Sequence, residues 1–388
     1  MRIPLSAPDI SQEDIDAVAA VFRTPWLSLG PKLEEFEDAM ARYVGVENAI
    51  GVSSGTAGLH LCIRALGIGE GDEVIVPSFA FIAVANAVRY EKATPVFVDI
   101  EPETLNLDPS RIAAAITSRT KAILVVHTFG CPADLPAILE IARRHHLCVI
   151  EDACEAIGAE FDGRRVGGWG DAGVFAFYPN KQITTGEGGM VVTENPRIAA
   201  LVRTLRNQGR MDSGDWLQHS EVGYNYRLAE MNCALGISQM KRIDAILARR
   251  EEIARKYNEK LRGMENLRLP ALEVPRCKLS WFVYVVRLSG AFSQKHRDWI
   301  MNEMHLRGIG CGRYFAPIHM QPAYRSACGP TAGLRVTEFE APRCLALPFF
   351  NRLQDEQIDE VCANLGDLLQ AAGSRAMQES SRNSAASF

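Results

Sequence analysis

The stretch FAFYPNKQITTGEGGMVV, residues 175–192, is the most informative segment of the sequence. An apolar run leads into Lys181, and glycines follow this lysine at positions 186, 188 and 189. Glycine lets the backbone adopt positive φ and pass close to a bulky planar group. A lysine held in such a loop can form a Schiff base with an aldehyde. Most lysines are solvated surface charges, so the flanking sequence must supply the rest of the argument.

Short apolar runs alternate with helical stretches on both sides of this loop. The runs show no strict apolar–polar alternation, which is typical of strands that are covered on both faces. The alternation predicts an α/β fold, with a large domain whose mostly parallel sheet is sandwiched by helices. Ligands of such sheets bind beyond the carboxyl ends of the strands. The runs are NAIGV, DEVIVP, TPVFV, KAILVV, LCVIED, AGVFAF and GGMVVT.

The pattern changes near residue 235, where a long helical stretch begins. It leads into a smaller region with one strand-like run, WFVYVVRL, and two further helical stretches. We therefore expect a large domain over residues 1–240 and a small α+β domain over residues 241–372. The Ser-rich stretch over residues 373–388 is predicted to be a disordered tail.

Composition excludes several classes of protein. The chain has 388 residues, 47% of them hydrophobic, and a net charge of −5, so it lacks the basic footprint of proteins that bind nucleic acid or anionic membranes. It shows no secretory signal and no apolar run of membrane-spanning length, which predicts a cytoplasmic protein. The ten cysteines are scattered without CxxC or zinc-type spacing, so we expect reduced thiols and no metal site.

Two further segments carry chemistry. Asp152 lies at the end of the run VIED, 29 residues before Lys181. A carboxylate there can keep a pyridine nitrogen protonated, although an isolated Asp is more often a helix cap or a surface charge. In SSGTAG, a turn of small residues leads into a helix, whose first amides can hold a phosphate. Gly55, Thr56 and Ala57 would supply those amides, although such turns are common.

An aromatic residue could stack on a planar ligand near these groups. Phe79 and Phe81 follow a strand in VPSFAF, and core packing is the commoner fate of Phe. A phosphate turn, an aromatic, an Asp after a strand, and then a Lys before a Gly-rich loop occur in this order. This is the layout of fold-type-I enzymes that use pyridoxal 5′-phosphate (PLP).

The sequence resembles the DegT/DnrJ/EryC1/StrS family of PLP-dependent aminotransferases, which act on keto sugars that are mostly nucleotide-activated. The resemblance covers roughly residues 3–370. The strings that carry it are SSGTAGL, EDACEAIGA, GDAGVFAFYPNKQITTGEGGMVVT, VGYNYRLAEMNCALGISQ and PIHMQPAY.

The resemblance implies a role for several residues around the cofactor. Lys181 would form the Schiff base and then act as the acid and base of the proton shift. Asp152 would pair with the pyridine nitrogen, and Glu155 would lie near the ring hydroxyl. Phe81 matches the stacking aromatic better than Phe79 does.

Phosphate binding is the second implication of the resemblance. Thr56 and Ala57 would bind the phosphate, and Asn225 in GYNYR would reach the phosphate of the neighbouring subunit's cofactor. That role implies a homodimer with shared active sites. One position departs from the family: many relatives have Ser where this chain has Ala176, which removes one phosphate donor.

Substrate-side residues are assigned by the same resemblance. Gly30, in SLGPKLEEFE, would lie in a sugar-facing loop. Tyr314 and His319, in RYFAPIHMQPAY, would lie in the loop that reaches the nucleotide diphosphate. Arg227 could grip a phosphate or carboxylate with two hydrogen bonds. Each of these residues could equally serve only the structure of its loop.

The implied function is amino transfer from L-glutamate to a keto group of a nucleotide-activated sugar, with ping-pong kinetics. Position C4 is favoured because Glu155 resembles the residue of perosamine-type synthases. Amination at C3, or of a keto-cyclitol, stays open. Two other classes are a regulator that binds PLP or a sugar nucleotide without catalysis, and a fold-type-I lyase. The intact Lys181 and Asp152 argue against the regulator.

Overall fold

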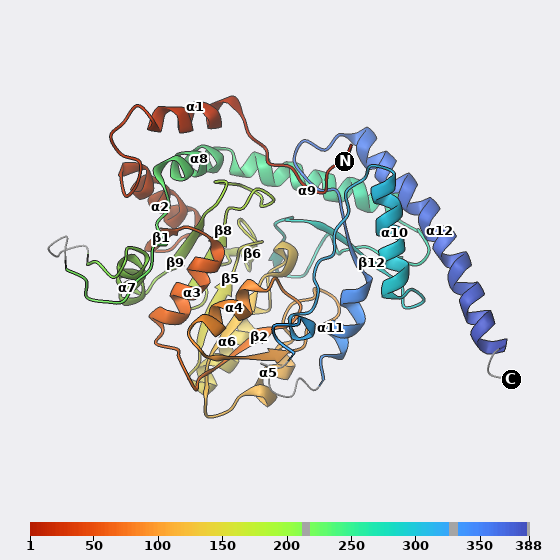
Figure 1. The fold of residues 1–388 in the computed structure, drawn as a ribbon, viewed down its shortest axis with the longest axis horizontal. Helices are drawn as coiled ribbons and strands as arrows, with labels where there is room; N and C mark the ends of the chain where they lie inside the picture. The colour runs from red at the N-terminus through yellow and green to blue at the C-terminus, as the bar shows by residue number, and fades with distance from the viewer. Residues whose placement is uncertain (212–217, 326–332, 386–388) are drawn as a thin grey trace.

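The computed structural model of the chain describes residues 1–211, 218–325 and 333–385. Its main feature is a seven-stranded sheet in the order β1-β9-β8-β5-β4-β2-β3 (Figure 1). All seven runs expected from the sequence are strands of this sheet. They are β1 (Asn48–Val52), β2 (Glu73–Pro77), β3 (Thr94–Val98), β4 (Thr120–Val126), β5 (Cys148–Asp152), β8 (Ala172–Ala176) and β9 (Gly189–Thr193).

Strand direction and burial confirm the expected fold class. Neighbouring strands from β3 to β8 pair in parallel, and β9 runs antiparallel to both of its neighbours. In β4, Ile123 and Val125 belong to one apolar core, whereas Leu124 and Val126 belong to the other. Because successive side chains point to opposite faces, a strand covered on both sides must be apolar throughout.

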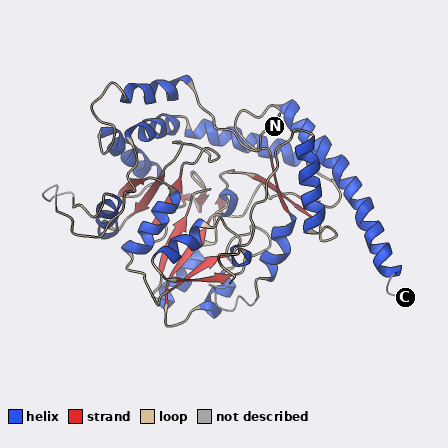
Figure 2. Cartoon of the chain, in the orientation of Figure 1, coloured by secondary structure: helices blue, strands red, loops and turns tan. Residues whose placement is uncertain are grey.

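Helices cover the two faces of the sheet (Figure 2). One core includes residues of α2, α5 and α6, and the other includes residues of α3, α4 and α7. Ser11 caps the start of α1 with a capping box, and Gly45 ends α2 at φ 85°. The helices are α1 (Gln12–Val21), α2 (Pro31–Val44), α3 (Gly55–Ala65), α4 (Ala83–Tyr90), α5 (Pro109–Ala115), α6 (Leu135–His145) and α7 (Pro196–Arg206).

A second unit has its own apolar core. Its three-stranded sheet has the order β10-β12-β13, and Ile3 from the start of the chain also packs in this core. A small sheet, β11-β6-β7, joins the two units. Its strands β6 and β7 lie between β5 and β8 of the large unit, whereas β11 follows α9. The remaining helices and strands of the two units are α8 (Glu230–Lys241), α9 (Ile243–Leu261), α10 (Gln294–Leu306), α11 (Arg335–Glu340), α12 (Asp355–Ala385), β6 (Glu160–Phe161), β7 (Arg164–Arg165), β10 (Leu267–Arg268), β11 (Cys277–Lys278), β12 (Tyr284–Leu288) and β13 (Cys344–Leu347). Of these, α8 and β6 contribute to a core of the large unit.

The C-terminal end differs from the expectation for residues 373–388. Helix α12 continues to Ala385, and its last turns project away from the rest of the molecule (Figure 1). The composition of the stretch is polar and Ser-rich, but it contains no proline that would end the helix earlier. Residues 386–388 lie outside the described part of the chain. None of the described helices is long and apolar enough to cross a membrane.

A buried carboxylate fixes the end of β5, where Asp152 lies. The neighbouring Glu151 is fully buried and accepts hydrogen bonds from the N–H groups of Gly167, Trp169 and Gly170 at 2.6–2.7 Å. The His127 ring lies 3.1 Å from the same carboxylate. Burial alone would raise the pKa of Glu151, but these hydrogen bonds hold it below its usual value.

We expect Glu151→Ala to lower the free energy of unfolding by about 3–5 kcal/mol, because three buried N–H groups lose their acceptor. Urea unfolding at fixed protein concentration measures this change. Glu140→Ala is the matched control, since Glu140 forms ion pairs only with exposed Arg143 and Arg144. A loss below about 1 kcal/mol for Glu151→Ala would show that this anchor is not needed.

Candidate active site

A cavity of about 510 Å³ opens at the carboxyl ends of β1, β5 and β8. Parts of both units line it, so the site lies between the large sheet and the second unit. Of the residues predicted for the site, it brings six of the cofactor group and one of the substrate group together. They are Gly55, Thr56, Phe81, Asp152, Glu155, Lys181 and Tyr314.

Lys181 lies in the loop that follows β8, and its side chain is 13% exposed. Its Nζ is 3.7 Å from Oε1 of Glu155 and 4.0 Å from the centre of the Phe282 ring. A carboxylate and an aromatic face both attract the ammonium group. The amino group is therefore held inside the cavity and directed away from solvent, as covalent chemistry at a lysine requires.

Asp152 ends β5 and lies at the wall of the same cavity, where it is 7% exposed. Its Oδ1 accepts a hydrogen bond from the N–H of Cys154 at 3.0 Å. The carboxylate is thus fixed by the turn after the strand and faces the cavity. This placement fits a partner for a protonated ring nitrogen.

The turn before α3 forms the predicted phosphate site. Ser54 caps the helix by accepting a hydrogen bond from the N–H of Ala57 at 3.1 Å, and Ala57 itself does not line the cavity. A Cβ at Gly55 would lie 2.8 Å from Cβ of Ala176 and from Sγ of Cys154. A side chain at Gly55 would crowd both residues. Ser54 takes the N–H groups of Ala57 and Gly58, which leaves those of Gly55 and Thr56 to meet an anion.

The departure at Ala176 has a structural counterpart. Ala176 ends β8, lines the cavity and packs against Gly55. The side chain of Ala176 offers no hydrogen-bond donor at the cavity wall, where Thr56 also lies. The start of α3 and Thr56 would therefore supply the donors for a phosphate.

The two candidate aromatic residues separate clearly. Phe79 is fully buried in an apolar cluster with Phe129 and Phe315. Phe81 lines the cavity and is 60% exposed. An exposed ring at a cavity wall is free to stack on a planar ligand, so Phe81 fits the stacking role.

Glu155 is buried beside Lys181 and Phe129. Its Oε2 accepts a hydrogen bond from the N–H of Phe129 at 3.0 Å. Burial raises the pKa of Glu155 to about 7, against the lowering effect of the Lys181 charge. The carboxyl group can therefore hold or release a proton near neutral pH.

Because the folded-state pKa of Glu155 exceeds its usual value of 4.5, the folded protein retains this proton between about pH 4.5 and 7. The resulting stability is present at low pH and is lost as the pH rises through 7. We expect the stability of the cofactor-free protein to fall by about 3 kcal/mol more from pH 5 to pH 8 than that of Glu155→Gln. Urea unfolding at both pH values measures the difference, and parallel pH dependences would contradict the assignment.

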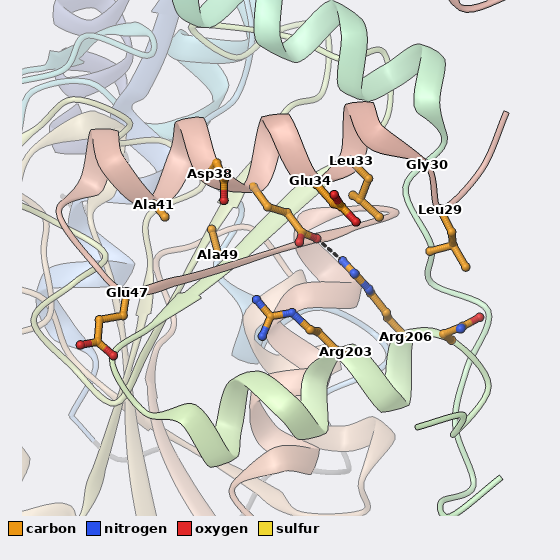
Figure 3. Close-up of a pocket in the computed structure, with 12 residues that line it drawn as sticks. Leu29, Gly30, Leu33, Glu34, Asp38, Ala41, Glu47, Ala49, Arg203 and Arg206 are labelled. Carbon is orange, nitrogen blue, oxygen red and sulfur yellow. Dashed lines mark hydrogen bonds and ion pairs between the residues drawn. The ribbon is translucent and has the colours of Figure 1, made fainter. Parts of the chain in front are cut away.

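Besides Ala57, four predicted residues lie outside this cavity. Gly30 begins α2 and lines a separate cavity of about 490 Å³, which also contains the buried Glu37–Arg206 ion pair (Figure 3). The N–H of Gly30 donates to Glu230, which also caps the next residues of α2. In this chain Gly30 is therefore the N-cap residue of α2, held by the Glu230 carboxylate.

The other three residues lie on neighbouring loops. Asn225 is exposed, and Nη1 of Arg227 donates to Oδ1 of Asn207 at 3.1 Å. His319 is held by Ser78, whose Oγ lies 2.6 Å from Nδ1. Burial lowers the pKa of His319 despite the nearby Glu338. None of these three side chains lines the Lys181 cavity of its own chain.

The structure adds cavity residues that the sequence interpretation did not include. Phe282 and Arg313 come from the second unit, and Asn180 comes from the lysine loop. Nδ2 of Asn180 lies 3.5 Å from the hydroxyl of Tyr314. The aromatic run around Phe282 reads as an ordinary core strand. Arg313 directly precedes Tyr314, which was predicted to contact the substrate. This neighbouring position was the only sequence signal that could have indicated Arg313 as a cavity residue.

The residues fit PLP. The cavity combines a lysine amino group, a facing carboxylate, an aromatic wall and a helix start that no side chain fills. These are the groups that an aldehyde, a pyridine nitrogen, a planar ring and a phosphate require. Lys181, Asp152, Phe81 and the turn at Gly55–Thr56 would hold these four parts.

Comparison with known proteins gives concordant results. The model of the DegT/DnrJ/EryC1/StrS aminotransferase family matches residues 8–366. GDP-perosamine synthase of Caulobacter vibrioides is 42% identical over 370 residues, which cover 95% of this chain and 98% of the relative. The structure of S. venezuelae DesV with a ketimine intermediate has a TM-score of 0.88 at 36% identity, covering 95% of this chain and 98% of that one. The structure of DesI in the presence of its TDP-sugar product has a TM-score of 0.89 at 31% identity, covering 98% of this chain and 96% of that one.

Proposed function

Because the chain belongs to the DegT/DnrJ/EryC1/StrS aminotransferase family, we propose that it transfers an amino group from L-glutamate to a keto group of a nucleotide-activated sugar. PLP is the proposed cofactor. The observation that carries this proposal is the position of Lys181 in one cavity with Asp152, Phe81 and the open start of α3. A reactive lysine, a ring-nitrogen partner and a phosphate site meet there.

Position C4 of a deoxysugar is the proposed acceptor. The 42% identity to GDP-perosamine synthase over nearly the full length of both chains supports a nucleotide sugar of that kind. The resemblance of the motif around Glu155 to that of perosamine-type synthases points to the same position. In this chain Oε1 of Glu155 lies 3.7 Å from Nζ of Lys181.

The mechanism follows from the side chains around the cavity. When bound, PLP supplies an electron sink that stabilises the negative charge left by removal of a proton from carbon. Nζ of Lys181 would take the proton from the α-carbon of the amino acid in the first half-reaction, and it would donate a proton to the former keto carbon of the acceptor in the second. Asp152 keeps the ring nitrogen protonated, and Phe81 and Phe282 restrict water at the cavity wall. Two substrates that use one site in turn imply ping-pong kinetics.

A homodimer belongs to this proposal. Asn225 is exposed and lies away from its own Lys181 cavity, although its motif is one of the two most specific of the resemblance. We propose that Asn225 contacts the cofactor phosphate of the partner subunit. Each active site would then need both chains.

Arg313 is the proposed contact for substrate anions. It lines the cavity, and its Nη2 is held by Oδ2 of Asp298 at 3.1 Å. Glutamate carries carboxylates and a nucleotide sugar carries a diphosphate, and an arginine can bind either. We expect Arg313→Gln to raise KM for at least one substrate about fivefold, because the side chain is half-exposed. Arg307→Gln, on an exposed arginine outside the cavity, is the control, and unchanged KM for both substrates would exclude the role.

Transfer of labelled nitrogen tests the function itself. The purified protein is supplied with PLP, nitrogen-15 L-glutamate and a panel of GDP- and TDP-linked sugars with the keto group at C4 or C3. Mass spectrometry of the products then detects the label. We expect label in a C4 keto sugar; label only in C3 keto sugars or keto-cyclitols would move the position, and no label in any acceptor would reject the proposal.

A further inference from the structure

A buried polar cluster lies along the helix that begins at the phosphate site. His60, on α3, is 4% exposed, and its Nε2 is 2.8 Å from Oε1 of Glu91. Its Nδ1 is 3.2 Å from the hydroxyl of Tyr226, and the hydroxyl of Tyr224 donates to Oε1 of Glu91 at 2.9 Å. The two tyrosine rings stack with centroids 5.0 Å apart. The cluster thus holds both tyrosines that flank Asn225.

Backbone hydrogen bonds attach the same segment to the large unit. The N–H of Tyr226 donates to the C=O of Arg206 at 2.9 Å, and the N–H of Tyr224 donates to that of Leu205 at 2.6 Å. The C=O of Tyr226 accepts from Ser53, which directly precedes the cap of α3, at 2.8 Å. In such an extended segment, alternate side chains point to opposite sides. Tyr224 and Tyr226 point inward, so Asn225 points outward and is exposed.

The hydrogen-bond pattern of the cluster is complete for a neutral histidine. Burial lowers the pKa of His60, against the effect of Glu91. A neutral ring with its proton on Nε2 donates to Glu91 and accepts from Tyr226 at Nδ1. Burial alone would raise the pKa of Glu91, but hydrogen bonds from His60 and Tyr224 keep it low, and Arg64 adds an ion pair at 3.3 Å. Glu91 orients His60 and Tyr224, and His60 orients Tyr226, so these hydrogen bonds hold both tyrosine side chains in one favoured position.

We propose that His60 and Glu91 are positioning residues for the cofactor: through Tyr224 and Tyr226 they fix Asn225 for contact with the phosphate at the partner subunit. This inference rests on the proposed function, including the homodimer. Its structural basis is the geometry of α3, which carries the phosphate turn of one site at its start and the anchor for Asn225 at its middle. One rigid helix therefore aligns both contributions to phosphate binding.

A double-mutant cycle of cofactor binding tests the inference. The cofactor-free homodimer is titrated with PLP, and the absorbance of the bound cofactor gives Kd. We expect Asn225→Ala to raise Kd about tenfold and the pair Tyr224→Phe with Tyr226→Phe to raise it about fivefold. Combined with Asn225→Ala, the tyrosine pair should add nothing, because it acts through Asn225. Pyridoxal, which lacks the phosphate, should bind all variants equally.

One control and one substitute variant complete the test. Tyr90→Phe alters a half-exposed ring that contacts His60 edge-on at 5.2 Å, and it should leave Kd unchanged. If the variant with both tyrosine substitutions does not fold, Glu91→Gln takes its place in the double-mutant cycle. Additive effects, or an equal loss for pyridoxal, would overturn the inference and leave only a structural role. A wild-type protein that binds no PLP would instead reject the proposed function.

Discussion

Lys181→Ala is expected to lower kcat for amino transfer by at least about 10⁴-fold. The variant loses the covalent link to the cofactor and also the base that moves the proton, and proton transfer alone contributes about 10²–10⁴-fold. The burial of Nζ against Glu155 and Phe282 leaves water a poor substitute at that position. Steady-state release of 2-oxoglutarate with PLP, saturating glutamate and keto sugar measures kcat.

Lys181→Arg separates charge from chemistry. The guanidinium keeps the positive charge beside Glu155 but forms no Schiff base and retains its protons at neutral pH. We expect this variant to be as inactive as Lys181→Ala while keeping the fold. If either variant retained kcat within tenfold of wild type, Lys181 would not be the reactive lysine.

Asp152→Asn gives the second-largest expected effect, a fall in kcat of about 10²-fold or more. The amide keeps the size of the side chain but loses the negative charge that holds a proton on the ring nitrogen. A hydrogen bond to a charged group contributes up to about 3 kcal/mol, which corresponds to this factor. Steady-state kinetics with saturating glutamate and keto sugar measure kcat.

Asp171→Asn is the matched control for this substitution. Asp171 precedes β8, and its Oδ2 accepts a hydrogen bond from the N–H of Val149 on β5 at 2.8 Å. Asp171→Asn is thus the same Asp-to-Asn change beside β5 and β8, but Asp171 does not line the cavity. We expect kcat within about twofold of wild type. Equal losses for both variants would mean that strand geometry, and not the cavity carboxylate, explains the effect.

The central sheet and the lysine side of the site could be predicted because their signals are local. Each of the seven strands is apolar on both faces, as β4 illustrates, and each is separated by a helix or a turn. Asp152, Gly55 and Lys181 follow strands whose carboxyl ends meet at one edge, so their sequence positions already placed them together. Strands β5 and β8 are parallel neighbours, and β1 runs in the same direction on the far side of antiparallel β9, so the three carboxyl ends lie at one edge of the sheet.

Contacts between distant segments account for what the sequence did not reveal. The helical stretch expected from about residue 235 begins at Glu230 and breaks at Arg242. The guanidinium of Arg242 pairs with Asp9 and Asp14, more than 220 residues away, which no local pattern encodes. The strands β6, β7, β10 and β11 have two residues each, too few to show a period. Phe282 reaches Lys181 only through the packing of the second unit.

The absorbance spectrum of the PLP-loaded protein, before and after L-glutamate, tests the central claim most directly. The account predicts a visible band from lysine-bound PLP, which glutamate bleaches to the amino form of the cofactor and a keto sugar restores. Lys181→Ala should show neither the band nor the exchange. A wild-type band that persists in glutamate, or an identical cycle in Lys181→Ala, would contradict amino transfer centred on Lys181.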